Sequence, residues 1–93
     1  MRGRKTDANQ AAIVAVLREV GASVVDLSAV GKGVPDLLVG FRGQTYLLEV
    51  KNKKGRNRIT ADQEVFYAWW RGAEAVIVYN ENDALMAIGI TEG

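Results

Sequence analysis

The chain has 93 residues, of which 48% are hydrophobic and 25% are charged, with a formal net charge of +1. This length allows one domain with a modest core, so we expect a single domain over residues 1–93. The lack of cysteine excludes disulfides and thiolate nucleophiles, and the lack of histidine excludes an imidazole base and histidine-ligated metal sites.

The N-terminal residues 1–5 are basic and contain nothing that could pack, so we expect a flexible arm. Asp7 and Gln10 have capping-box spacing, and they precede an apolar stripe formed by Ile13, Val14, Leu17 and Val20. This pattern predicts a helix from about Asp7 to Val20, with Asp7 as its N-cap.

A strand is predicted over residues 22–27, followed by a glycine-rich loop over residues 28–33. The loop lacks the spacing of a P-loop and of a dinucleotide fingerprint, so we expect no nucleotide cofactor. Its glycines would let a phosphate backbone approach closely, although an ordinary connection explains them equally well. We count Lys32 among the candidate nucleic-acid-binding residues.

Residues 33–51 read as a β-hairpin whose tight turn is Arg42-Gly43. A two-residue turn fixes the register, pairing Phe41 with Gln44, Val39 with Tyr46 and Leu37 with Leu48. Asp36 then lies opposite Glu49, and Lys51 projects on the same face as Glu49.

Opposed carboxylates repel each other unless a cation lies between them. We therefore expect Asp36, Glu49 and the Val50 carbonyl to coordinate Mg²⁺ or Mn²⁺, with Lys51 orienting a bound water. The alternative is an ordinary surface salt bridge between Lys51 and Glu49.

The loop over residues 52–58 is polar and basic. Because it follows the candidate catalytic strand directly, we expect it to contact nucleic-acid phosphates, with a solvated loop as the alternative. The candidate residues in it are Lys53, Lys54, Arg56 and Arg58.

Thr60 and Gln63 again have capping-box spacing, which predicts a second helix to about Arg71. Its apolar residues Val65, Phe66 and Trp69 are expected to pack on the sheet, and Tyr67 and Trp70 to point elsewhere. A helix that is aromatic nearly all round favours a homodimer through this helix. A base-stacking surface is the competing interpretation.

Near the C-terminus, residues 75–79 predict a strand. Asn82 or Asp83 could then cap a short helix, although the last ten residues could also form an edge strand. The elements in order are helix, strand, hairpin, helix and strand, which indicates an α/β fold.

Pro35-Asp36 followed by Glu49-Val50-Lys51 resembles the PD-(D/E)XK nuclease signature, and the surrounding sequence is similar to its small VRR-NUC branch, especially stand-alone phage-like members. The resemblance implies a restriction-endonuclease-like αβββαβ core, in which helices flank a mixed central sheet. It also implies Mg²⁺- or Mn²⁺-dependent cleavage of branched or flapped DNA, including Holliday junctions, with Gln63 in the active site.

In related Holliday-junction resolvases the first helix supplies a further acidic residue. The matching position here is Gln10, which leaves open whether Gln10 or Asp7 contributes to the site. Two alternatives to a DNA nuclease remain: a non-catalytic DNA-binding module of the same fold, and a small nuclease acting on RNA. No apolar run is long enough to cross a membrane, so we expect a cytoplasmic protein without a membrane partner.

Overall fold

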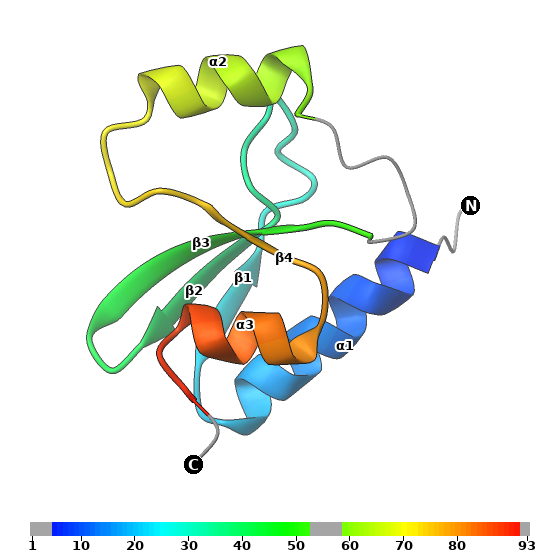
Figure 1. The fold of residues 1–93 in the computed structure, drawn as a ribbon, viewed down its shortest axis with the longest axis vertical. Coiled ribbons are helices and arrows are strands. Elements are labelled where there is room, and N and C mark those ends of the chain that lie inside the picture. Colours follow the sequence, from blue (N-terminus) through cyan, green and yellow to red (C-terminus); the bar gives the residue numbers. More distant parts are fainter. Residues whose placement is uncertain (1–4, 53–58, 92–93) are drawn as a thin grey trace.

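A computed structural model describes residues 5–52 and 59–91 of the chain. Three helices and four strands lie in these ranges (Figure 1). In chain order they are α1 (Lys5–Glu19), β1 (Ser23–Asp26), β2 (Leu37–Phe41), β3 (Gln44–Val50), α2 (Ala61–Trp69), β4 (Val76–Val78) and α3 (Glu81–Ala87). The predicted α/β class is confirmed.

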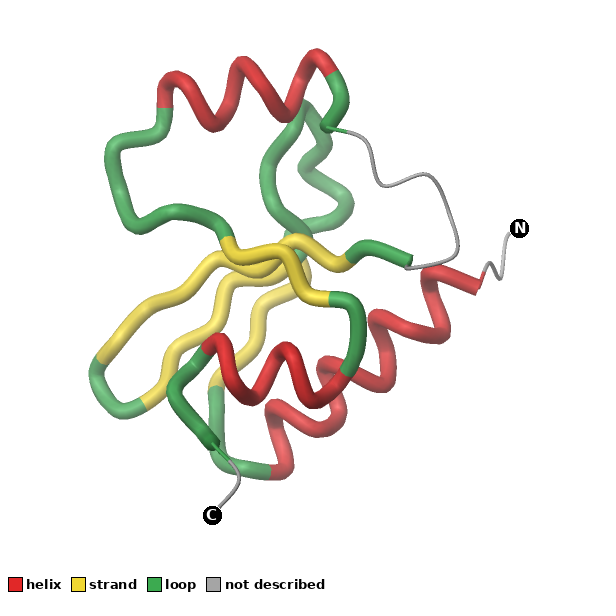
Figure 2. The backbone as a smooth tube through the Cα atoms, viewed as in Figure 1, coloured by secondary structure: helices red, strands yellow, loops and turns green. Residues whose placement is uncertain are grey.

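The four strands form one mixed sheet in the order β1-β2-β3-β4. β1, β2 and β3 are antiparallel neighbours, whereas β3 and β4 are parallel. Parallel neighbours need a crossover connection, and α2 lies within that connection. Figure 2 shows α2 on one side of the sheet and both α1 and α3 on the other.

The hairpin register agrees with the prediction, because Leu37 pairs with Leu48 and Phe41 with Gln44. Arg42 and Gly43 both have positive φ, at 52° and 79°. Positive φ at both central positions is the pattern of a type I′ turn, which suits the twist of a two-residue hairpin. The turn sequence alone was therefore enough to set the pairing of both strands.

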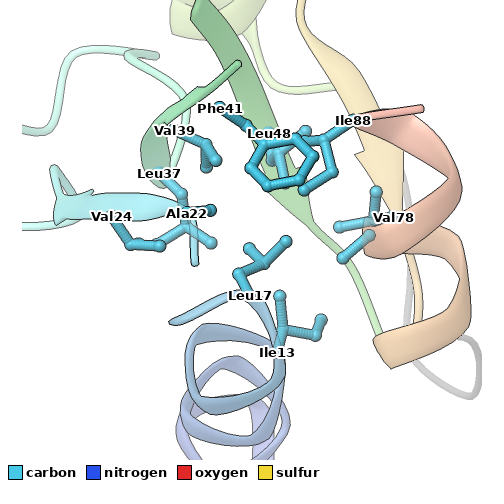
Figure 3. Packing of buried hydrophobic residues seen from close by; sticks show 11 residues of the cluster. Ile13, Leu17, Ala22, Val24, Leu37, Val39, Phe41, Leu48, Val78 and Ile88 are labelled. Carbon is cyan, nitrogen blue, oxygen red and sulfur yellow. The ribbon is translucent and has the colours of Figure 1, made fainter. Parts of the chain in front are cut away.

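The hydrophobic core lies between the sheet and the pair α1 and α3 (Figure 3). Ile13 and Leu17 of α1 are fully buried against side chains from the strands and from the end of α3. Full burial of one such side chain contributes about 1.5 to 3 kcal/mol. The strand residues in the core are Val24, Leu37, Val39, Phe41, Leu48 and Val78.

The prediction that Val65 and Trp69 pack on the sheet is wrong, because they are 68% and 65% exposed. The apolar core occupies the opposite face of the sheet. On the face near α2, the buried polar residue Glu49 of β3 contacts Gln63 of the helix. The helix therefore turns a polar residue, rather than its apolar side chains, toward the sheet.

Three predictions about helix ends and the chain start need correction. α1 begins at Lys5, so Lys5 is not part of a flexible arm and Asp7, inside the helix, is not its N-cap. Residues 1–4 lie outside the described residues. α3 is capped by Asn80, whose side chain accepts from the Asp83 N–H, and not by Asn82 or Asp83.

The C-terminal segment through Ala87 is helical, so the alternative of an edge strand is also wrong. The capping box of α2 is confirmed, with Thr60 as the N-cap. Within residues 5–52 and 59–91, no helix is long and apolar enough to cross a membrane.

Candidate metal and phosphodiester site

The acidic residues of the predicted site come together at the end of the hairpin opposite its turn. Asp36 directly precedes β2, and its backbone carbonyl accepts from the Leu27 N–H at 2.7 Å. Its side-chain Oδ2 accepts from the Val50 N–H at 2.8 Å. Asp36 is thus hydrogen-bonded to Leu27 on one side and to Val50 on the other, which holds its carboxylate beside the end of β3.

Glu49 lies on β3 and points away from the hydrophobic core. Its neighbours Leu48 and Val50 belong to the core cluster, and alternate residues of a strand face opposite sides of a sheet. Lys51 therefore shares the face of Glu49, and its Nζ lies 3.5 Å from Glu49 Oε2. The predicted convergence of these two side chains is present.

The two oxygens of the Glu49 carboxylate differ in their contacts with the described residues. Oε2 accepts a hydrogen bond from Gln63 Nε2 at 2.7 Å in addition to its contact with Lys51. Oε1 is buried and has no hydrogen-bond partner among the described residues, and the whole residue is only 6% exposed. Burying a carboxylate oxygen without a hydrogen-bond donor costs folding free energy, and a bound cation or a proton on this atom would reduce that cost.

Both carboxyl groups hold their protons more tightly than usual. Burial raises the pKa of Asp36, against the lowering effect of the Val50 N–H and of Lys51. Burial also raises the pKa of Glu49, and the negative charge of Asp36 raises it further. The ionised pair therefore costs folding free energy, which a bound divalent cation would offset.

The Val50 carbonyl opens on the same side as Asp36. The Lys51 N–H donates to Val78 of β4, so the preceding residue directs its N–H and C=O toward β2. Extending the hairpin register by two residues places Pro35 opposite Val50, and proline has no N–H to donate to that carbonyl. The Val50 carbonyl, which the sequence predicted as the third oxygen ligand, therefore points toward the side of β3 on which Asp36 lies.

Gln63 serves the helix cap and the site at once. Its side-chain Oε1 accepts from the Thr60 N–H at 2.9 Å, while Thr60 Oγ1 accepts from the Gln63 N–H at 3.2 Å. Its Nε2 remains free to donate to Glu49. The cap orients the side-chain amide, so Gln63 can cap the helix and contact the candidate site at the same time.

The start of α2 is held against the glycine-rich loop by Gly33. A Cβ at Gly33 would lie 2.2 Å from the Asp62 carbonyl oxygen and 2.7 Å from the Gln63 nitrogen. Gly33 also has a φ of +80°, which side chains rarely adopt. Only glycine fits here, and this contact brings Gln63 to the sheet.

The first helix does not join the carboxylate pair through Gln10. Gln10 Nε2 donates to Asp26 Oδ2 at 3.1 Å, and Asp26 also accepts from Ser28. Gln10 makes no hydrogen bond to Asp36 or Glu49. The Asp7 side chain lies outside the described residues, so its contribution remains a prediction.

The predicted phosphate-contacting residues are mostly outside the described chain. Lys53, Lys54, Arg56 and Arg58 belong to residues 53–58, which lie outside the described residues. Lys32 is exposed in the loop before Asp36. It is therefore accessible to a ligand at that edge.

Sequence reasoning missed two residues near the site. Asn9 Nδ2 donates to the carbonyls of Lys51 and Tyr79, which ties α1 to the ends of β3 and β4. Tyr67 lies close enough to the carboxylates for the charges on Glu49 and Asp36 to raise its pKa, after the larger effect of burial. No local pattern could reveal Asn9, because its partners are 42 and 70 residues away.

The described residues contain no group of three or more His, Cys, Asp or Glu side chains that could hold a metal ion. The available side-chain ligands are thus the two carboxylates. Mg²⁺ commonly binds through one or two carboxylates, with waters and phosphate oxygens completing its shell. The donor set fits an ion shared with a phosphate-containing ligand.

Comparisons with protein-family models, with curated proteins and with solved structures found no match for this chain.

Proposed function

We propose that this protein is a metal-dependent phosphodiesterase, and specifically a structure-specific DNA endonuclease of the VRR-NUC type. The observation that carries the proposal is Glu49 Oε1, which is buried and has no hydrogen-bond partner among the described residues, while Oε2 of the same carboxylate contacts Lys51 and Gln63. An ordinary salt bridge with Lys51 accounts for Oε2 but not for the buried Oε1, which has no partner among the described residues. A restriction-endonuclease-like core is supported by the strand order and by the single parallel pair at β4.

Asp36, Glu49 and the Val50 carbonyl would hold Mg²⁺ or Mn²⁺. When bound, the ion polarises a phosphodiester and lowers the pKa of a coordinated water, which supplies the activation that the absent histidines cannot. Gln63 keeps Glu49 in place by donating to Oε2, so that Oε1 faces the ligand. The protein thus holds a preorganised pair of hard oxygen ligands.

Lys51 supplies positive charge next to the reacting phosphate. Its ammonium lies 3.5 Å from Glu49 Oε2, and its side chain is only 12% exposed. In this position it would orient the attacking water and offset the negative charge that develops on the phosphate oxygens. Asp36 and Glu49 would thus bind the metal ion, and Lys51 would stabilise the transition state.

Replacing Lys51 by alanine should reduce cleavage by about 10²-fold or more, because a preorganised charge next to the developing oxyanion is lost. The measurement is the rate of cleavage of labelled four-way junction, flap and duplex DNA in Mg²⁺. Arg42→Ala removes the same charge at the hairpin turn, at the far end of β2 and β3, and should leave the rate unchanged (Figure 1). Full activity in the Lys51 variant would refute the assignment.

A homodimer through α2 belongs to this proposal. Val65 and Trp69 on α2 are 68% and 65% exposed, and Trp70 at the end of the helix is 37% exposed. Phe66 stacks on Trp70 with ring centroids 5.4 Å apart, so the aromatic side chains form a preordered surface. Two sites related by a two-fold axis would suit symmetric cleavage of a four-way junction.

The dimer is tested by light scattering at micromolar concentration. The wild-type chain should give twice the monomer mass, and Val65→Glu should give a monomer because it places a charge in the interface. Met86→Glu is the matched control, since Met86 is 55% exposed on α3, on the other side of the sheet from α2. A wild-type monomer would count against the dimer without affecting the proposed chemistry.

A non-catalytic DNA-binding module of the same fold is the main rival, and a nuclease acting on RNA is the second. One assay separates the three: purified protein is incubated with branched DNA, duplex DNA and RNA in Mg²⁺, in Mn²⁺ and in EDTA. Metal-dependent cleavage of branched DNA supports the proposal. Binding without cleavage, unaffected by EDTA, would support the module instead.

A further inference from the structure

Helix α2 directs a second polar side chain toward the carboxylate pair. Tyr67 follows Gln63 by four residues, so the two lie on one face of the helix, a turn apart. Gln63 is buried and Tyr67 is partly buried, whereas Val65 and Trp69 on the other faces are largely exposed. Tyr67 therefore lies on the side of α2 that faces the site.

The hydroxyl of Tyr67 is a hydrogen-bond donor on the face of α2 from which Gln63 contacts Glu49. Burial raises the pKa of Tyr67, and the negative charges of Glu49 and Asp36 raise it further. The phenol consequently stays protonated at neutral and moderately alkaline pH. A neutral donor here adds no positive charge that would compete with a metal ion for the carboxylates.

The ring is held in place while its hydroxyl makes no hydrogen bond within the described part of the chain. Phe66 contacts the Tyr67 ring edge to face, with centroids 6.0 Å apart and an interplanar angle of 71°. With no partner among the described residues, the hydroxyl can donate to a bound ligand. The other polar groups nearby already have theirs, because Gln63 binds Thr60 and Glu49.

We propose that the Tyr67 hydroxyl donates a hydrogen bond to a non-bridging phosphate oxygen of the phosphodiester held at Asp36 and Glu49. This inference rests on the proposed function and adds a substrate-contacting residue to it. Phosphate oxygens are strong acceptors, and a fixed donor on α2 would orient the scissile group relative to the ligands on β3. The hydrogen bond strengthens as negative charge develops on the phosphate, so it acts mainly on kcat.

The test compares Tyr67→Phe with wild type in steady-state cleavage of labelled four-way junction and flap DNA in Mg²⁺. Loss of one hydrogen bond to a charged group should lower kcat by about 10- to 100-fold, with KM within about threefold. Mg²⁺ is expected to raise the melting temperature of wild type by binding the folded chain, and it should raise that of Tyr67→Phe equally, since no metal ligand changes. Tyr46→Phe is the matched control, because its hydroxyl lies 3.5 Å from the Ile88 carbonyl on the core side, and its kcat should be unchanged.

Several results would overturn the inference. Wild-type kcat in Tyr67→Phe would do so while leaving the proposed nuclease intact. A rise in KM alone would place the contact away from the reacting phosphate, and loss of the Mg²⁺ effect would show a role in the metal site instead. Absence of cleavage by wild type on every substrate would refute the proposed function, and the inference with it.

Discussion

Glu49→Gln should abolish metal-dependent cleavage and raise the melting temperature of the metal-free protein at pH 8. The substitution keeps the size of the side chain and its acceptor for Gln63. It removes the charge that Asp36 repels and that burial penalises. With the metal ligand lost, the cleavage rate should fall by about 10³-fold or more.

The pH dependence of this effect follows from the raised pKa of Glu49. A carboxyl whose pKa is higher in the folded chain stabilises the fold in its protonated form, below its ordinary value of 4.5. That stability is lost as the pH rises through the raised pKa of the folded state. The gap in melting temperature between Glu49→Gln and wild type should therefore widen from pH 4 to pH 8.

Thermal denaturation with and without Mg²⁺ measures both effects. A tenfold excess of Mg²⁺ over its dissociation constant should stabilise wild type by about 1.4 kcal/mol, a shift of several degrees, and should leave Glu49→Gln unchanged. Glu19→Gln removes one charge at the exposed end of α1 and should still respond to Mg²⁺. A full Mg²⁺ response in Glu49→Gln would contradict the metal site.

Gly33→Ala should displace α2 and reduce cleavage by about 10²-fold. The added Cβ would lie 2.2 Å from the Asp62 carbonyl oxygen, so the start of α2 must move and carry Gln63 away from Glu49. Such a displacement next to reacting groups commonly costs about 10²-fold in rate. Clash and backbone strain together should cost about 2 to 4 kcal/mol of stability.

Gly31→Ala is the control that introduces backbone strain at a positive φ without a steric clash. Gly31 also has positive φ, at 72°, but a Cβ there would meet nothing within 4 Å. It should cost about 1 kcal/mol and leave cleavage intact. Tryptophan fluorescence reports on α2 directly, because the only two tryptophans are Trp69 and Trp70. Equal fluorescence and activity in the two variants would show that Gly33 does not position the helix.

Local sequence determined the parts of the site that depend on neighbours in the chain. The two-residue turn at Arg42-Gly43 set the hairpin register, because a strand has a period of two and the turn leaves no freedom to slip. The spacing of Thr60 and Gln63 likewise predicted the start of α2. The positions of Asp36 and Glu49 at one end of the hairpin followed from counting alone.

Only the tertiary structure decided how α2 meets the sheet. Helical periodicity tells which residues share a face, but α2 is apolar on several faces, so periodicity could not choose between Val65 with Trp69 and Gln63 with Tyr67. The choice came from a contact that no local pattern contains, between Gly33 and the first turn of α2. The same contact brings Gln63 to Glu49 Oε2, and Oε1, which has no partner among the described residues, is where the chemistry is proposed to occur.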